Sequence, residues 1–136
     1  RDPEMSRGLG DVYKRQSIDA AIHLDQEILP SMMIQIPVEN SVKHALRGKE
    51  GKRNLWIAAD RREGGVCIRI TDNGGGYHPE SRNRGTGTGM KFIMQTIQIL
   101  NMKNLAAIDI SVHNVTLPSG ETGCEVTFLL PDKYDY

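Results

Sequence analysis

Three short stretches of this chain carry residues whose types and spacing could hold a nucleotide. The first, 39–44, reads Glu-Asn-Ser-Val-Lys-His and places a carboxylate, an amide, an amine and an imidazole within about one and a half helical turns. The second, 72–76, reads Asp-Asn-Gly-Gly-Gly, and the third, 85–89, reads Gly-Thr-Gly-Thr-Gly. Together they predict a pocket with a polar helix face for metal and phosphate, an acid for the base and a flexible lid between them.

The first stretch gathers polar groups on one side of a predicted helix. Residues three and four apart share a helix face, so Asn40, Lys43 and His44 point the same way. The amide oxygen of Asn40 is a suitable ligand for Mg²⁺, and Lys43 offers a point charge to phosphate. Glu39 could polarise a water or bind metal through one. The alternative is a solvated helix face with ordinary charges.

The second stretch begins with an acid at the end of an apolar strand. Asp72 follows the run 68–71, so it emerges where a buried strand ends. A buried carboxylate needs a hydrogen-bond donor, which the 6-amino group of adenine would supply. Gly74 and Gly76 let the backbone approach a flat ring closely and turn with positive φ. The alternative is an ordinary Asp-Asn-Gly turn.

The third stretch resembles a phosphate-binding loop. Its small residues expose backbone amides and run into a predicted helix, whose N-terminus favours anions. It is not the dinucleotide fingerprint, because no strand precedes it, and it lacks the Walker lysine and serine. The polar segment 77–84 predicts a lid over a triphosphate, and the alternative is a surface loop. Two residues of this segment are candidate phosphate contacts: Arg82 and Arg84.

Length and composition indicate one globular domain with no nucleic-acid partner. The chain has 136 residues, enough for one core, and its 17 basic and 17 acidic residues give a net charge of zero. No apolar run approaches the roughly 20 residues of a membrane span, and no signal peptide is visible. Cys67 and Cys124 lie in strand-like runs and are expected to be free, buried thiols.

Apolar periodicity predicts the elements that would position the three stretches. Alternation predicts strands at 18–24, 54–59, 66–71, 108–112 and 126–130. Helical spacing predicts helices at 31–46 and 89–100, and Pro37 should bend or split the first. The order strand, helix, two strands, helix, two strands predicts an α+β fold. It is a two-layer α/β sandwich with the helices on one face of a mixed, mostly antiparallel sheet.

Residues 1–16 stand apart from this pattern. They carry four basic residues and no apolar periodicity, which predicts a disordered leader. The run 5–16 also looks like translated cloning or adapter sequence joined to a natural gene fragment. We therefore expect a non-native or disordered leader over 1–16, a nucleotide-binding domain over 17–136, and a natural protein that extends further upstream.

In this order, the three stretches resemble the nucleotide-binding boxes of the LytS/YehU-type sensor histidine kinases. Residues 30–44 resemble their N box, residues 72–76 match their G1 box and residues 85–90 their G2 box. The similarity covers about residues 18–131. It implies the Bergerat ATP-binding (HATPase) fold of gyrase, heat-shock chaperone, histidine kinase and MutL ATPases. The short gap between the last two boxes agrees with this subfamily.

The resemblance implies ATP and Mg²⁺ as ligands and gives individual residues a role. Asn40 would ligate Mg²⁺, Glu39 would lie near the γ-phosphate, and Lys43 would contact phosphate, so these three are the implied catalytic residues. Asp72 would bind the adenine amino group. The other residues implied to bind ATP are His44 on phosphate, Gly74 and Gly76 beside the base, and Arg82, Arg84, Gly85, Gly87 and Gly89 in the lid.

The chain departs from the family pattern at three points. The family usually reads Gln-Pro-Leu-Val-Glu-Asn, whereas Pro37 here is displaced by one position. Related ATPases often have threonine after the glycine of the last strand, where this chain has Cys124. The dimerising helices and the phosphoacceptor histidine of such kinases lie upstream. The four histidines of this chain are poor candidates for the acceptor.

The resemblance therefore implies the ATP-binding catalytic domain of a bacterial two-component sensor histidine kinase. It would deliver the γ-phosphate to a histidine on the upstream dimerisation helix, with that helix and a cognate response regulator as partners. The domain itself would be cytoplasmic, within a membrane-anchored sensor. Two alternatives with the same fold are an anti-sigma-factor serine kinase and a non-catalytic regulatory module.

Overall fold

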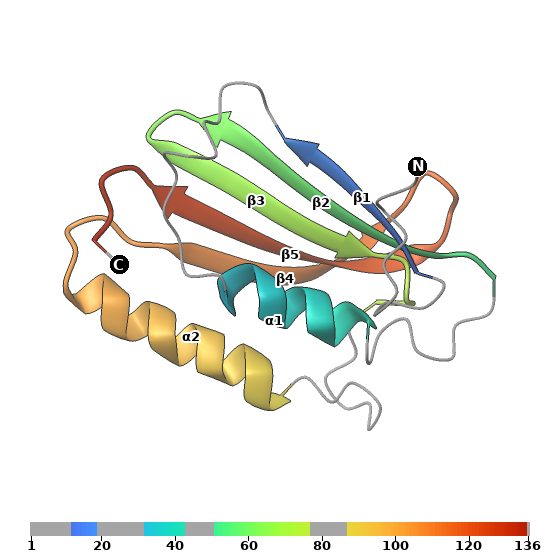
Figure 1. Ribbon diagram of the computed structural model, residues 1–136, viewed down its shortest axis with the longest axis horizontal. Coiled ribbons are helices and arrows are strands. Elements are labelled where there is room, and N and C mark those ends of the chain that lie inside the picture. Colours follow the sequence, from blue (N-terminus) through green and yellow to red (C-terminus); the bar gives the residue numbers. More distant parts are fainter. Residues whose placement is uncertain (1–11, 19–31, 43–50, 77–86, 136) are drawn as a thin grey trace.

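The computed structural model describes residues 12–18, 32–42, 51–76 and 87–135. Its elements follow the predicted order of strand, helix, two strands, helix and two strands (Figure 1). They are β1 (Val12–Ile18), α1 (Met32–Asn40), β2 (Arg53–Arg62), β3 (Gly65–Asp72), α2 (Gly87–Met102), β4 (Asp109–Thr116) and β5 (Thr122–Pro131).

The five strands form one sheet in the order β1-β2-β3-β5-β4. β1 runs parallel to β2, and every other neighbouring pair is antiparallel. Both helices lie on the same face of the sheet, so the predicted two-layer sandwich with a mostly antiparallel sheet is confirmed (Figure 1). Among the described helices, none is long and apolar enough to cross a membrane.

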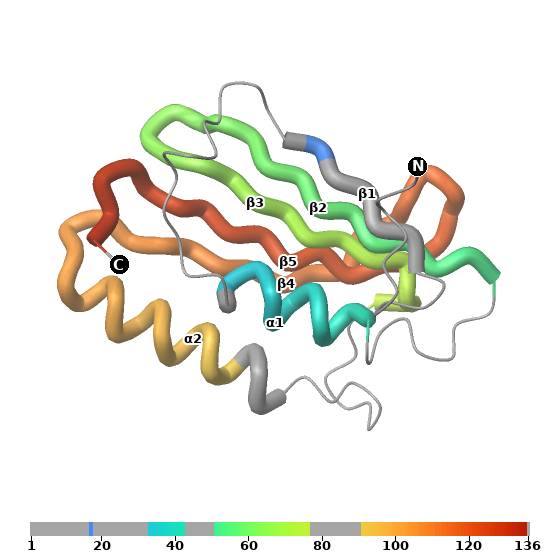
Figure 2. Tube along the Cα trace, in the orientation of Figure 1, coloured from blue at the N-terminus to red at the C-terminus, as the bar shows by residue number. Residues whose placement is uncertain are grey.

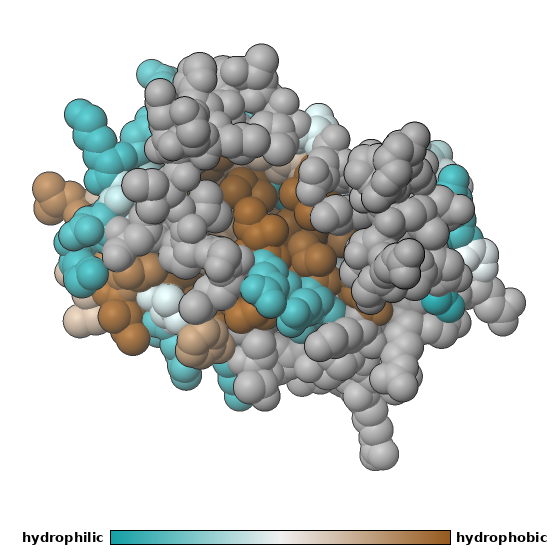
Figure 3. Space-filling model, viewed as in Figure 1, coloured by the Kyte–Doolittle hydropathy of each residue, from teal (hydrophilic) through white to brown (hydrophobic). Residues whose placement is uncertain are grey.

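The core lies between the two helices and the central strands. Alternate residues of β3 and β5 point toward the helices, and Ile70 and Phe128 are each 1% exposed. Met33 of α1 and Ile93 of α2 pack against them in the same cluster. A fully buried side chain of this size contributes about 1.5–3 kcal/mol, so this cluster fixes where both helices lie. Apolar residues gather between and over the helices in Figure 3.

Several element boundaries differ from the sequence-based expectation, and β2, β4 and β5 are each longer than expected. Strand β1 includes residues 12–16, which were expected to be disordered, because they pair in parallel with β2 from Val12 to Ile18. The expected strand at 18–24 lies almost wholly outside the described residues. The backbone of α1 stays helical through Pro37. The helical path of α1 continues to Val42 as a wider turn of π type, and α2 begins two residues earlier than expected.

Candidate functional site

The C-terminal ends of α1 and β3 meet on one side of the molecule (Figures 1 and 2), and a buried carboxylate lies between them. Asp72, the last residue of β3, is 3% exposed. Its Oδ1 accepts a hydrogen bond from the amide of Gly74 at 2.9 Å, and its Oδ2 accepts one from the hydroxyl of Ser41 at 2.9 Å. The backbone amide of Cys124 is a third donor to this carboxylate. We call these four residues the Asp72 end.

Burial dominates the electrostatics of Asp72. Desolvation raises the pKa of its carboxyl group above the usual value, while the hydrogen bonds from Gly74, Ser41 and Cys124 lower it. A carboxylate has about four acceptor positions, of which these donors use three. Among the described residues, one acceptor position is therefore left without a donor.

The glycines after Asp72 follow the predicted path only in part. Gly76 has a positive φ angle of 92°, as expected, whereas the other positive φ angle, 95°, belongs to Gly75 and not to Gly74. A side chain at Gly76 would also meet the amide of Asn114, at 3.0 Å, and Thr122, at 3.1 Å. The amide of Gly75 donates to the carbonyl of Thr122 at 3.0 Å. The loop is thus held tightly against the β4–β5 turn, beside Asp72.

Asn73 has a structural role that the sequence did not reveal. Its side chain is buried and connects three chain segments. Its Oδ1 accepts from the amide of Asn54 at 2.9 Å, and its Nδ2 donates to the carbonyl of Lys52 at 3.0 Å and to Glu121 at 3.3 Å. These bonds fix the start of the glycine loop relative to β2.

The candidate metal ligand lies at the C-terminal end of α1. Asn40 is half-buried, and its Nδ2 is buried with no hydrogen-bond partner among the described residues. Glu39 is exposed and accepts a hydrogen bond from Gln35 at 3.1 Å. In the described part of the chain, no three His, Cys, Asp or Glu side chains converge on a point that could hold a metal ion.

Two of the remaining candidate residues lie in the first turn of α2. Gly87 and Gly89 belong to that turn, which confirms that the third stretch runs directly into a helix. The remaining candidates lie outside the described residues: Lys43, His44, Arg82, Arg84 and Gly85.

Cys124 lies directly opposite Asp72 in the pairing of β3 with β5. Burial, together with the negative charges of Asp72 and Glu125, raises the pKa of its thiol to about 12. At neutral pH the group is therefore a neutral S–H. Cys124 and Cys67 are both free thiols, as expected; Cys67 is also buried as expected, whereas Cys124 is only partly buried.

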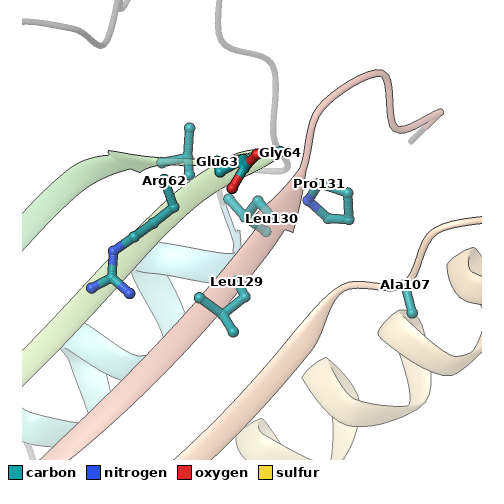
Figure 4. A pocket seen from close by; sticks show the side chains of 9 residues that line it. Arg62, Glu63, Gly64, Ala107, Leu129, Leu130 and Pro131 are labelled. Carbon is teal, nitrogen blue, oxygen red and sulfur yellow. The ribbon is translucent and has the colours of Figure 1, made fainter.

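The far end of the same strands carries a concavity that the sequence did not predict. The β2–β3 turn and the end of β5 enclose about 320 Å³ there (Figure 4). Its lining is mainly apolar, with the charged side chains of Arg62 and Glu63 at the turn. We call this region, together with the flanking ion pair of Arg61 and Asp132, the hairpin end; it covers residues 61–66 and 129–132.

Comparison with known proteins decides the family. The family described as histidine kinase-, DNA gyrase B-, and HSP90-like ATPase matches residues 25–134. The chain belongs to this ATPase family. The match contains all three polar stretches, so the resemblance predicted from them is confirmed.

Curated relatives of this ATPase domain are sensor kinases. The chain is 30% identical over 134 residues to the tetrathionate sensor histidine kinase TtrS of Salmonella typhimurium, covering 90% of this chain and 21% of the relative. It is 26% identical over 121 residues to the sensor protein LytS of Bacillus anthracis, covering 81% of this chain and 19% of the relative. The chain thus spans about a fifth of the length of these relatives.

Solved structures show the same fold. The catalytic domain of histidine kinase ThkA superposes with a TM-score of 0.59 at 15% identity, covering 92% of this chain and 81% of that one. Histidine kinase AdeS of Acinetobacter baumannii gives a TM-score of 0.55 at 14% identity, covering 93% of this chain and 57% of that one. The architecture is therefore that of a histidine kinase ATP-binding domain.

Proposed function

We propose that this ATPase domain binds Mg·ATP with the adenine at the Asp72 end, and that it is the catalytic domain of a two-component sensor histidine kinase. The observation that carries the proposal is the carboxylate of Asp72, which is desolvated at the end of β3. Its three protein donors leave one acceptor position, and the adenine amino group supplies the matching donor. A domain with no ligand for this position would gain nothing from burying a charge there.

The neighbouring residues fit a flat base. Gly76 has no side chain at the point where one would meet Asn114, so the loop backbone can approach its neighbours closely. Cys124 takes the position where related ATPases often have threonine. Its neutral S–H is a weak donor, so it preserves part of the hydrogen-bonding capacity of a hydroxyl there.

The phosphate and metal end is proposed at α1 and the first turn of α2. Asn40 would hold Mg²⁺ through its amide oxygen, and its Nδ2, which is buried and has no partner among the described residues, would donate to a phosphate oxygen. When bound, Mg²⁺ bridges phosphate oxygens and offsets their charge. Glu39 would lie toward the γ-phosphate, and Gly87 and Gly89 would offer free amides at the start of α2. The proposed phosphate contacts outside the described residues are Lys43, His44, Arg82, Arg84 and Gly85.

The proposed reaction is transfer of the γ-phosphoryl group to a histidine on an upstream dimerisation helix of the same kinase. In such a reaction the protein mainly positions groups and offsets developing charge. The cognate response regulator would be the next partner, and the domain would work on the cytoplasmic side of a membrane-anchored sensor. The sensor-kinase names of the relatives support this proposal.

Asn40→Ala tests the metal role. We expect the 136-residue chain to bind a nonhydrolysable ATP analogue more tightly with Mg²⁺ than without it, as measured by calorimetric titration. Removal of the amide ligand should lower the affinity in Mg²⁺ by about tenfold or more and leave the metal-free affinity nearly unchanged. Gln98→Ala, on the exposed side of α2, is the matched control and should bind like the wild type.

Two results would contradict the proposal. Equal Mg²⁺ dependence in Asn40→Ala and the wild type would remove Asn40 as the ligand. A folded wild-type chain that binds no nucleotide would overturn the ATP site itself and favour a regulatory module with the same fold.

A further inference from the structure

The hydroxyl of Ser41 makes the one side-chain hydrogen bond to Asp72 among the described residues. Ser41 is 7% exposed, lies in the last described turn of α1, and donates to Oδ2 of Asp72 at 2.9 Å across 31 positions of sequence. The other two donors, at Gly74 and Cys124, are backbone amides. A side-chain substitution can therefore remove the Ser41 donor alone.

The Ser41 hydroxyl opposes the main force on Asp72. Burial favours the protonated carboxyl group, whereas each donated hydrogen bond favours the carboxylate. A hydrogen bond to a charged group is among the stronger ones, and it is stronger still where water is excluded. Loss of the hydroxyl therefore shifts this balance toward the protonated form.

We propose that Ser41 is a positioning residue that holds Asp72 as an oriented acceptor, and that it thereby makes the site select a 6-amino purine over a 6-oxo purine. This inference rests on the proposed function, in which the base lies at the Asp72 end. It adds to that function a residue of α1 that determines which base is accepted.

The selectivity follows from donors and acceptors. An ionised Asp72 only accepts hydrogen bonds, so it matches the amino group at position 6 of adenine. A 6-oxo purine such as hypoxanthine has a carbonyl at that position, and two acceptors would then face each other without a proton. A protonated Asp72 carries a donor and removes that conflict. Sites built on a buried hydrogen bond discriminate strongly because the wrong ligand leaves polar groups unpaired.

Among the described residues, few other groups act on the protonation of Asp72. Ser41 faces it from α1, Gly74 from the loop and Cys124 from β5. Of these, Cys124 is titratable, and burial and the charge of Asp72 raise the pKa of its thiol to about 12. The thiol therefore stays neutral across the neutral range. In that range, the pH dependence of base selection reports on Asp72.

The test compares ATP with inosine triphosphate in calorimetric titrations of the 136-residue chain as a function of pH. We expect Ser41→Ala to weaken ATP binding by about tenfold and to lower the ratio of ATP to inosine triphosphate affinity. The pH at which ATP affinity falls should move upward, since the pKa of Asp72 rises without the donor. Ser41→Thr, which keeps the hydroxyl, should restore both, and Ser111→Ala on the exposed side of β4 should change neither.

A folded Ser41→Ala variant with an unchanged nucleotide ratio and an unchanged pH profile would overturn the inference. If that variant fails to fold, Ser41→Cys, a weaker donor of similar size, should give an intermediate ratio, and a wild-type ratio would overturn the inference equally.

A second readout separates this inference from the proposed function. The carboxyl carbon of Asp72, followed by nuclear magnetic resonance in the free chain, should titrate at higher pH in Ser41→Ala than in the wild type. If the wild type binds neither nucleotide, the proposed function and the base selectivity fall together. If the carboxyl group of Asp72 also titrated at the same pH in Ser41→Ala and in the wild type, Ser41 would have no effect on its protonation.

Discussion

The two ends of the β3–β5 pair are built alike in backbone and differently in charge. Each end has a glycine at a point where the strands leave no room for a side chain. A Cβ at Gly123 would lie 1.9 Å from the carbonyl oxygen of Asp72, and one at Gly65 would lie 2.2 Å from that of Leu130. Their charged groups differ. Asp72 is buried and has no cation beside it in the part of the chain that the structure describes, whereas Arg61 pairs with Asp132 at 2.7 Å on the surface of the hairpin end.

This difference in burial means that the charge of Asp72 lowers the stability of the unliganded protein more than the surface charges do. Surface ion pairs such as Arg61–Asp132 contribute little, about 0–1 kcal/mol, and carry little desolvation cost. A buried carboxylate costs free energy in the unliganded protein; the three protein donors offset part of that cost, and a donor on a ligand would offset more of it. This contrast supports the proposal that the Asp72 end is the functional one, whereas the charges of the hairpin end are ordinary surface charges.

Replacing Gly65 or Gly123 with alanine should give the largest effects on stability. It tests whether the two ends, which have similar backbones, differ in their effect on ATP binding. Gly123→Ala and Gly65→Ala each force the strands apart, so each should lower the free energy of unfolding by about 3 kcal/mol. Gly123→Ala should also weaken ATP binding, because it displaces the backbone of Asp72. Urea unfolding and nucleotide titration of both variants check this, and equal ATP affinity in the two folded variants would contradict the assignment of the site.

Asp72→Asn should have a smaller effect on stability, in the opposite direction. At pH values between 3.8 and the folded pKa, the folded chain holds a proton on Asp72 that the unfolded chain releases, because burial raises the folded pKa. Stability from this group therefore falls as the pH rises through 3.8 toward the folded pKa. An amide keeps the shape without the charge and can donate to Ser41, so the variant should be about 0.5–2 kcal/mol more stable at neutral pH.

Urea unfolding across pH measures this effect. Asp132→Asn at the hairpin end is the matched control, since it removes an exposed acid with a surface partner, and it should change stability by about 0.5 kcal/mol or less. A destabilised Asp72→Asn, or an equal gain in the control, would show that Asp72 carries no special cost.

Much of the fold could be predicted from sequence because it follows from local periodicity. Alternation in β3 and β5 and helical spacing in α2 gave the element order, and the position of Asp72 after an apolar run indicated its burial. Residues 12–16 could not be assigned in this way. They form an edge strand whose partner, β2, lies about forty positions later in the chain, as the pairing of Val12 with Arg53 shows.

The sequence named candidate residues for the site, but it did not predict the contacts between them. A spacing of three and four grouped Asn40 with residues further along the helix and passed over Ser41, which at 3.6 residues per turn lies about 100° away. The structure shows that this direction faces Asp72. The sequence had no signal for the three hydrogen bonds of Asn73. It also had none for the close approach of the Gly123 backbone to the carbonyl of Asp72. Both depend on strands that meet only in the folded chain.

The most direct test of this account is calorimetric titration of the wild type and Asp72→Asn with a nonhydrolysable ATP analogue in Mg²⁺. The account predicts saturable binding to the wild type and an affinity lower by about hundredfold or more in the variant, which should remain folded and be at least as stable. A folded Asp72→Asn that binds the analogue as tightly as the wild type would contradict the claim that the buried carboxylate recognises the base.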